Sequence, residues 1–449
     1  MKPFFYSIVL LLITSLADSQ TAEDYFIRGL AKYDLQDYKT AILYYTKVIE
    51  IDSGFPDVYN RRGFAKVAIQ DYKSAIVDYI KAVEIDPLNS SAYINRGDVY
   101  FFFRIYNQAI DDYSKAIEIN PKDENLYINR GCIKLSQLDF TGAIADFSKS
   151  IELKSNYAAA YNNRGVAKSE IKDHKGAITD FNKAIELEPK FIKPYLNKGE
   201  LEIALQKYDT AMTTYSKVIQ IDPFNEIAYI NRSIIFKNFQ DFVGAINDLT
   251  RAIQINPKNA GTYNKRGLLK AEFQDSKSAI ADYTKAIEIN PLNADSYFNR
   301  AMANMELAEY SFAIEDFNKV IEINPKDEMA YLNRGNAKVA NQDDAGSIDD
   351  FTKAIEINRQ NADAYFNRAF AKKEIQDYYG AIADYDIIIE INPKDAEAYY
   401  SRANVKNALG LKISSCLDYK KAEELGYIEA QEVSKCFCAK VKKKKWRLY

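Results

Sequence analysis

The sequence predicts an all-α protein in which about twelve pairs of helices stack into one solenoid, and three observations lead to this prediction. Prolines recur on a 34-residue grid, at positions 87, 121, 189, 223, 257, 291, 325 and 393. With proline at position 32 of each unit, twelve units run from Ala22 to Glu429 without an insertion or deletion, and position 4 is always tyrosine. Apolar residues within a unit form two segments of helical spacing. A fixed period of this length is typical of repeat architectures.

Each unit is expected to form two helices, A and then B, joined by a short turn. In the unit that starts at Ala158, the turn IKDHK separates the two apolar segments, and Pro189 ends the unit because a helix cannot continue there. Position 8 is glycine, alanine or serine in every unit, and position 20 is alanine or serine. Glycine inside a helix costs about 1 kcal/mol relative to alanine, so its repetition requires a compensating close contact. We therefore predict that A and B touch at positions 8 and 20, with aromatic residues at positions 4 and 24 around that contact.

The first residues have a different character from the repeats. Lys2 precedes the apolar stretch Phe4–Leu16, and Ser15-Leu16-Ala17 supplies the small residues that a signal peptidase needs. The apolar stretch is shorter than the ~20 residues that span a bilayer. Residues 1–17 are therefore predicted to be a cleaved signal peptide, and the mature protein is predicted to be exported, either periplasmic or secreted.

The composition argues against several classes of function. Sixty basic and 63 acidic residues leave a net charge of −3, so no basic excess indicates nucleic-acid binding. The only histidine, His174, stands where other units have a turn aromatic, and the glycines recur inside helices rather than in a phosphate-binding loop. We expect no enzyme activity, no cofactor and no metal site.

The repeat pattern resembles the tetratricopeptide repeat family. The resemblance rests on the 34-residue period, with an aromatic residue at position 4, small residues at positions 8 and 20, an aromatic residue at position 24 and proline at position 32. It implies a right-handed α-solenoid superhelix whose helices A line a concave groove that binds a peptide or a protein segment. The units are 22–55, 56–89, 90–123, 124–157, 158–191, 192–225, 226–259, 260–293, 294–327, 328–361, 362–395 and 396–429.

Two further positions depart from the family pattern. Position 7 is basic throughout, with arginine in eleven units and Lys198 in one, and position 23 is aspartate in ten units. Because these positions lie on facing helices, we expect ion pairs such as Arg96–Asp112, Arg130–Asp146 and Arg164–Asp180. At the edge of a packed face, each such pair would contribute about 0–1 kcal/mol.

Position 6 is asparagine in eight units, and two interpretations of this row are open. By resemblance, position 6 faces the groove, and the row resembles the asparagine ladder of O-linked N-acetylglucosamine transferases. An amide can bond a peptide backbone because it has both donors and an acceptor. In the other interpretation, each asparagine only bonds a neighbouring helix. The candidate peptide-binding residues are Asn95, Asn129, Asn163, Asn197, Asn231, Asn299, Asn333 and Asn367.

Specificity is expected from groove positions that vary between units, although any one of these side chains could instead pack between helices. The early units offer an apolar lining, the middle is acidic and the later units are again apolar. The candidates are Phe64, Phe101, Phe102, Glu170, Phe298, Met302 and Phe366.

A capping helix is predicted over residues 427–439, after Gly426, with a basic tail over 440–449. Cys416 and Cys436 are each ten residues from Gly426, and equidistant residues of an antiparallel hairpin face each other. Because an exported protein favours oxidation, we predict a Cys416–Cys436 disulfide. The tail could contact anionic lipid or an acidic partner, but we favour a solvated, frayed helix end.

Taken together, the sequence predicts an exported adaptor that binds an extended peptide or protein segment in the groove. The alternative is a structural scaffold of an envelope or surface complex, acting through the convex face and the basic tail.

Overall fold

The computed structural model describes residues 21–445, so the predicted signal peptide and residues 446–449 of the tail lie outside the described residues. The described residues form 25 helices and no strand. The chain divides into two compact units, one ending at Pro223 and one starting at Phe224, and each is treated by itself. The all-α solenoid predicted from the sequence is confirmed within each unit.

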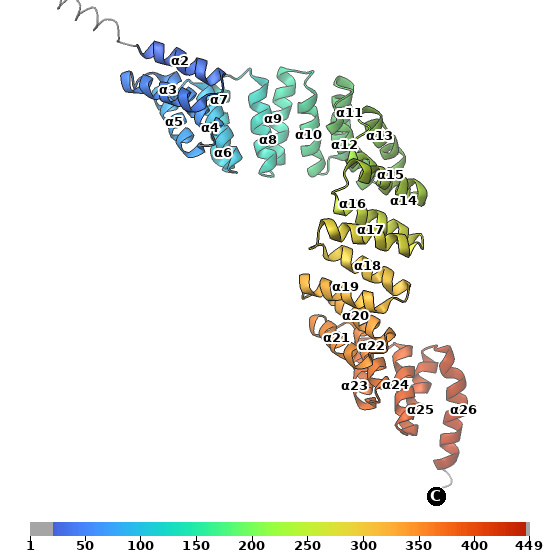
Figure 1. The fold of residues 1–449 in the computed structure, drawn as a ribbon. Helices are drawn as coiled ribbons and strands as arrows, with labels where there is room; N and C mark the ends of the chain where they lie inside the picture. The colour runs from blue at the N-terminus through green and yellow to red at the C-terminus, as the bar shows by residue number, and fades with distance from the viewer. Residues whose placement is uncertain (1–20, 446–449) are drawn as a thin grey trace, which may run out of the picture. The chain divides into compact units, whose positions relative to one another are not determined.

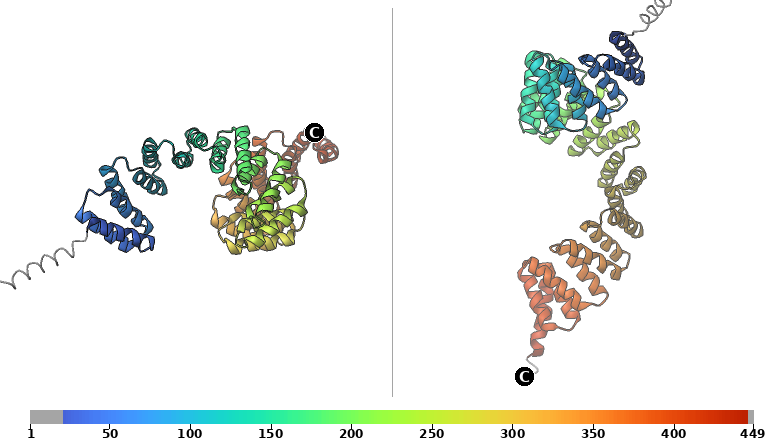
Figure 2. Two further views of the ribbon diagram at one scale, coloured as in Figure 1. Left: turned by 90° about the horizontal axis from the view of Figure 1, so that it is seen from above. Right: turned by 90° about the vertical axis from the view of Figure 1, so that its left-hand side faces the viewer.

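The first unit contains six helix pairs. Their bounds are α2 (Ala22–Asp34), α3 (Tyr38–Ile51), α4 (Pro56–Ala68), α5 (Tyr72–Ile85), α6 (Ser90–Phe102), α7 (Tyr106–Ile119), α8 (Glu124–Ser136), α9 (Phe140–Leu153), α10 (Ala158–Glu170), α11 (His174–Leu187), α12 (Ile192–Ala204) and α13 (Tyr208–Ile221). In Figure 1 and in the two turned views of Figure 2, consecutive helices of this unit lie antiparallel and side by side.

The second unit contains six more pairs and one final helix. Their bounds are α14 (Glu226–Asn238), α15 (Phe242–Ile255), α16 (Ala260–Glu272), α17 (Ser276–Ile289), α18 (Ala294–Glu306), α19 (Tyr310–Ile323), α20 (Glu328–Ala340), α21 (Asp344–Ile357), α22 (Ala362–Glu374), α23 (Tyr378–Ile391), α24 (Ala396–Ala408), α25 (Lys412–Glu424) and α26 (Ile428–Lys445). The capping helix α26 extends to Lys445 and so includes part of the segment predicted as a tail.

The turn between helices A and B has the same form in all twelve repeats. The residue at position 15 adopts a positive φ, from Gln36 (60°) to Gln376 (66°), and the last repeat has Gly410 there. This left-handed residue ends helix A, as is common at helix C-termini. In most repeats an aspartate at position 16 then caps helix B; for example, Asp139 accepts a hydrogen bond from the amide of Gly142 at 2.9 Å.

The contact between A and B falls where the sequence predicts it. A Cβ added to Gly131 would lie 2.7 Å from the ring of Phe147 at position 24, and Gly335 has the same relation to Phe351 at 2.6 Å. The residue at position 20 is fully buried in every repeat, including Ser347 and Ser415. Small residues therefore let the two helices approach until an aromatic ring lies directly on the backbone of helix A. None of the helices in the described part of the chain is long and apolar enough to cross a membrane.

Candidate functional site

Helices A of several neighbouring repeats contact each other directly in both units, and we call the surface that the helices A present the helix-A face. Helix α4 contacts α6 and α10 contacts both α8 and α12, although a helix B lies between them in the chain. The second unit has the same contacts, between α16 and α18 and between α20 and α22. The candidate groove residues predicted from the sequence belong to these helices.

Beneath this face, every aspartate at position 23 forms an ion pair with the arginine at position 7 of its own repeat. The guanidinium donates through Nε and one terminal nitrogen to the two carboxylate oxygens; in Arg130–Asp146 these bonds are 2.9 and 2.6 Å. The ten pairs are Arg62–Asp78, Arg96–Asp112, Arg130–Asp146, Arg164–Asp180, Arg232–Asp248, Arg266–Asp282, Arg300–Asp316, Arg334–Asp350, Arg368–Asp384 and Arg402–Asp418.

We expected these pairs at the edge of a packed face, but both side chains are largely buried. The side chain of Asp146 is 5% exposed and that of Arg130 is 18% exposed. A buried bidentate pair makes strong hydrogen bonds, but its two charges are costly to remove from water. Removing one partner leaves the other charge buried and unpaired, so it lowers stability far more than at a surface pair. The small contribution estimated for an exposed pair does not apply here.

Most of these arginines also join their repeat to the repeat before it; Arg96, which faces Ile80, has no such bond among the described residues. The second terminal nitrogen of Arg130 donates to the hydroxyl of Ser114 at 3.0 Å, across the boundary between repeats. The guanidinium lies 5.9 Å from the ring centre of Tyr127, at position 4 of its own repeat. One side chain therefore contacts helix A, helix B and the neighbouring repeat, which accounts for the absence of leucine at position 7.

A lysine at position 11 is a second cation on the same carboxylate in seven repeats, and it was not predicted from the sequence. It lies one helical turn after the arginine, and its nitrogen is 2.7–2.8 Å from the aspartate. The seven are Lys66, Lys134, Lys168, Lys270, Lys338, Lys372 and Lys406. The spacing of four residues was visible in the sequence and would have predicted them.

The sixth repeat replaces this arrangement. Lys198 stands for the arginine, and Thr214 stands for the aspartate and donates to Glu202 at 2.8 Å. Lys198 is 3.8 Å from the same glutamate. Glu202 is 4% exposed. In this repeat the buried carboxylate therefore belongs to helix A, whereas in the repeats that contain an Arg–Asp pair it belongs to helix B.

The ladder asparagines mostly bond the neighbouring repeat through one amide hydrogen. Asn95 donates to Asn60 at 2.9 Å, Asn197 to Asn162 at 2.9 Å and Asn299 to Asn264 at 3.2 Å. The other contacts run from Asn129 to the Tyr113 hydroxyl, from Asn163 to the Cys132 sulfur, from Asn367 to Asn336 and from Asn333 to the backbone oxygen of Met329 in its own helix. Each of these donated bonds uses one of the two hydrogens of the amide.

The acceptors Asn60, Asn162 and Asn264 all occupy position 5 and were not among the residues predicted from the sequence. Asn60 and Asn162 are 7% and 4% exposed. Asparagine at position 5 was visible in the sequence as a pattern confined to these three units. The fold turns it into a bond between repeats, because position 5 of one helix A faces position 6 of the next.

The predicted specificity residues divide into two groups. Phe64, Phe101, Phe102, Glu170 and Met302 are exposed on the helix-A face. Phe298 and Phe366 are half-buried, and each packs edge-on against the aromatic residue at position 24 of its own repeat, with ring centres 5.5 Å apart in both.

Three hollows open between neighbouring helices A, and each includes a ladder asparagine. The first, about 240 Å³, is lined by Phe64, Val67, Tyr72, Tyr79, Asn95, Asp98, Val99 and Phe102. The second, about 210 Å³, is lined by Val166, Ser169, Glu170, Phe181, Asn197, Glu200, Leu201 and Ala204. The third, about 290 Å³ and in the second unit, is lined by Leu332, Asn336, Ala362, Asp363, Phe366, Asn367, Ile388, Asp395 and Glu397.

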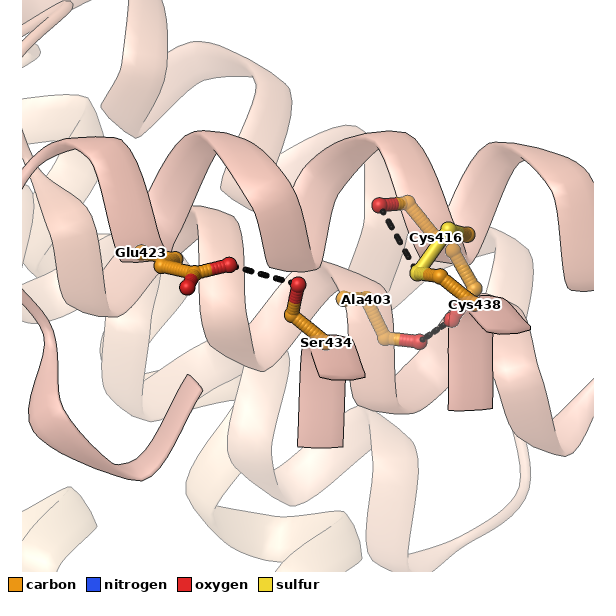
Figure 3. The surroundings of a disulfide bond; sticks show 6 residues. Ala403, Cys416, Glu423, Ser434 and Cys438 are labelled. Atoms are coloured by element: carbon orange, nitrogen blue, oxygen red, sulfur yellow. Dashed lines mark hydrogen bonds between the residues drawn. A yellow bond between two sulfur atoms is a disulfide. The ribbon is translucent and has the colours of Figure 1, made fainter. Parts of the chain in front are cut away.

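The C-terminal disulfide joins Cys416 to Cys438, so the predicted partner Cys436 is wrong. Figure 3 shows the bond between α25 and α26, with Ser434 donating to Glu423 at 2.6 Å beside it. Ala430, Ser434 and Cys438 are buried at intervals of four residues and define the face of α26 that packs on α25. The number of residues from the turn, on which the prediction of Cys436 rests, does not show which side of α26 faces α25.

The fold and the helix-A face define a class of protein, an α-solenoid of helix-pair repeats. Two models, both described as tetratricopeptide repeat, match residues 90–123, 158–191 and 294–327, and residues 22–55, 56–87, 192–225 and 260–291. Because these segments cover more than half of the chain, the chain belongs to the tetratricopeptide repeat family. Members of this family are protein-interaction scaffolds that bind proteins or peptides, and the fold is typically non-enzymatic.

The chain is also similar to solved structures. A C-terminal part of a repeat-containing protein from Cytophaga hutchinsonii is 18% identical, with TM-score 0.47, over 53% of this chain and 98% of that one. The MamA protein is 24% identical, with TM-score 0.36, over 38% and 93%. YrrB, described as a protein of this repeat class with an unusual peptide-binding site, is 22% identical, with TM-score 0.38, over 43% and 97%. A comparison with curated proteins found no match.

Proposed function

We propose that this protein is an exported, non-enzymatic adaptor that holds an extended peptide or protein segment against its helix-A face. One observation carries the proposal: the three hollows lie on this face, between helices A of successive repeats, and each combines a ladder asparagine with side chains that differ between repeats. A constant amide beside variable walls suits a partner whose backbone is held in the same way along its length and whose side chains are selected locally.

The hydrogen bonds of the ladder leave capacity for such a partner. The amide of Asn95 or Asn197 gives one hydrogen to the preceding repeat, which fixes its orientation. A second hydrogen and the carbonyl oxygen belong to the same amide, and a peptide backbone offers a matching acceptor and donor at every residue. The hydrogen bonds between repeats therefore orient the asparagine amides and leave the second hydrogen and the oxygen of each amide for a ligand.

A peptide-display selection on the full chain tests this function. The comparison is a triple variant with Asn95, Asn197 and Asn367 changed to Ala, and the control is a triple variant at Asn129, Asn299 and Asn333, which line none of the three hollows. We expect peptides that the parent enriches and the first triple variant loses, with unchanged helical content by circular dichroism. Equal enrichment by the parent and the first triple variant would refute binding at these hollows.

Export belongs to the same proposal and has its own test. It is supported by the apolar stretch Phe4–Leu16 with Ser15-Leu16-Ala17 at its end, and the Cys416–Cys438 disulfide suits an oxidising compartment. When the full chain is produced in a secreting host, we expect the mature protein to begin at Asp18. N-terminal sequencing that finds residues 1–17 still attached would contradict it.

A second candidate is a scaffold that acts through the opposite face, and one observation favours it. Leu43 and Val77 occupy the same position of two successive helices B, α3 and α5, and are 63% and 64% exposed. If this face binds the partner, changing both residues to Ser removes the enriched peptides, whereas the asparagine changes leave them.

A further inference from the structure

The repeat array has a second period of three repeats, in addition to the single-repeat period. Helix B lacks a side-chain cap in every third repeat, where Ile105, Lys207, Glu309 and Leu411 replace the capping aspartate. The position-5 asparagines that bond the ladder also recur at this interval, as Asn60, Asn162 and Asn264.

The first two hollows are the same site in two successive copies of this three-repeat block. Seven lining positions correspond at an interval of 102 residues: Phe64 with Val166, Val67 with Ser169, Tyr79 with Phe181, Asn95 with Asn197, Asp98 with Glu200, Val99 with Leu201 and Phe102 with Ala204. The walls differ in size, but both copies keep the asparagine and a carboxylate at position 9. Both carboxylates are exposed, and among the described residues neither has a cationic partner.

A buried polar group of the first hollow has no partner in the described part of the chain. The Tyr79 side chain is 0% exposed, yet its hydroxyl has no hydrogen-bond partner among the residues that the structure describes. A buried hydroxyl without a partner is costly, and the Tyr79 side chain lines the hollow together with Asp98. Asp98 is held in place by the Tyr113 hydroxyl, which donates to it at 2.5 Å.

The walls of the first hollow suit an aliphatic stem. Val67, Val99 and Phe102 are apolar, and the ring of Tyr72 stacks on Phe102 with centres 5.0 Å apart. A purely apolar side chain would fill this space but would take water from Asp98 without replacing it. A lysine or arginine combines an aliphatic stem for the walls with a cationic head for the carboxylate and the hydroxyl.

The second hollow also combines an apolar wall with negative charge, but it does so with different residues. Phe181 replaces Tyr79, so no buried hydroxyl is present, but two carboxylates, Glu170 and Glu200, border the hollow. Leu201 and Ala204 provide the apolar wall. Two negative charges on the rim attract a cation more strongly than one, which compensates for the missing acceptor.

From these observations we propose that the two hollows bind two basic side chains, lysine or arginine, of one extended protein segment that spans three repeats. The inference rests on the proposed function and adds the chemistry and spacing of the partner. Engaging two sites with one chain raises affinity well above that of either site. A basic segment also complements the acidic rims, whereas a nucleic acid would be repelled by them.

The test uses the full chain and synthetic peptides that carry two lysines separated by a varied number of glycine and serine residues. Matched peptides carry norleucine, which keeps the aliphatic stem without the charge. We expect one range of spacing to bind best, and replacement of either lysine by norleucine to weaken binding about tenfold. Equal binding of lysine and norleucine peptides would overturn the proposal.

Substitutions in the protein separate the two hollows. Asp98→Asn and Glu200→Gln are each expected to weaken the best peptide about tenfold and to leave single-lysine binding at the other hollow intact. Tyr79→Phe should weaken binding about threefold without lowering thermal stability, because it removes a hydroxyl that has no partner in the free protein. Tyr45→Phe is the matched control, since that hydroxyl is also buried and unpartnered but lines neither hollow.

Failure of this inference can be told apart from failure of the proposed function. If display peptides depend on Asn95 and Asn197 but show no preference for basic residues, only the partner chemistry is wrong. If no peptide depends on these asparagines, the proposed function fails first. Equal effects of Tyr79→Phe and Tyr45→Phe on binding would also overturn the assignment of the first hollow.

Discussion

Removal of a position-23 carboxylate should cost more where two cations share it than where one does. Asp146 binds both Arg130 and Lys134, whereas Asp112 binds Arg96 and has Tyr100 in place of the lysine. The changes Asp146→Asn and Asp112→Asn keep the shape of the side chain and remove one charge. The same substitution in two adjacent repeats therefore leaves two cations without their carboxylate in one repeat and one cation in the other.

The magnitude follows from burial and from the number of cations left behind. The Asp146 side chain is 5% exposed and its two cations are each 18% exposed. Removing one partner of a buried pair costs about 3–5 kcal/mol, so we expect about 3 kcal/mol for Asp146→Asn in this partly solvated setting. Asp112→Asn strands one cation and should cost about half as much, roughly 1.5 kcal/mol.

The protonation equilibrium of Asp112 also favours a small loss of stability on its replacement by Asn. Burial is the largest cause of the raised pKa of Asp112, ahead of the lowering effect of Arg96. A carboxyl whose pKa is raised in the folded state contributes stability at low pH and loses it as the pH rises through that pKa. The hydrogen bond with Asp112 in turn raises the pKa of Arg96, so the ionised pair is favoured by this contact and opposed by burial, and replacing Asp112 by Asn is the milder change.

Hydrogen–deuterium exchange of the full chain is the suitable assay, because a long repeat array does not unfold in one cooperative step. Each 1.4 kcal/mol corresponds to a tenfold change in local opening, so exchange in α9 should rise about 100-fold in Asp146→Asn and exchange in α7 about tenfold in Asp112→Asn. Equal increases, or a larger increase for Asp112→Asn, would refute the argument that the second cation sets the cost.

Three further outcomes are expected. Gly131→Ala should destabilise its repeat by about 1 kcal/mol, since the overpacking against Phe147 exceeds the gain in helix propensity; slower exchange in α8 would contradict this. Asp71→Ala removes the cap of α5 and should cost about 1 kcal/mol, seen as faster exchange in the first turn of that helix. Reduction of Cys416–Cys438 should cost about 3 kcal/mol, measured as faster exchange confined to α25 and α26, with two more titratable thiols after denaturation.

The sequence was sufficient for the features that repeat in most units. The proline grid, the small residues at position 8 and the Arg–Asp pairing follow from periodicity, because twelve copies of one pattern leave a single packing solution for each position. The burial of those ion pairs could not be predicted, since position 7 appears as an edge position until the neighbouring repeat covers it. Likewise the Cys416 partner depended on the rotational phase of α26, which only the buried row Ala430, Ser434 and Cys438 reveals.

The three-repeat period was present in the sequence but hidden by the stronger single-repeat pattern. Copying alone would preserve a missing cap such as Ile105 or Lys207, because its cost of about 1 kcal/mol is small beside the interfaces between repeats. Copying alone would also preserve the lining of the two hollows, yet their walls have changed while Asn and an acidic residue remain. In the third copy Met302 replaces the acidic residue. An acidic residue at position 9 therefore distinguishes the two hollows of the first unit from the third copy. Changing Asp98 to Asn together with Glu200 to Gln should abolish binding of the basic segment, even though every residue of the second unit is intact.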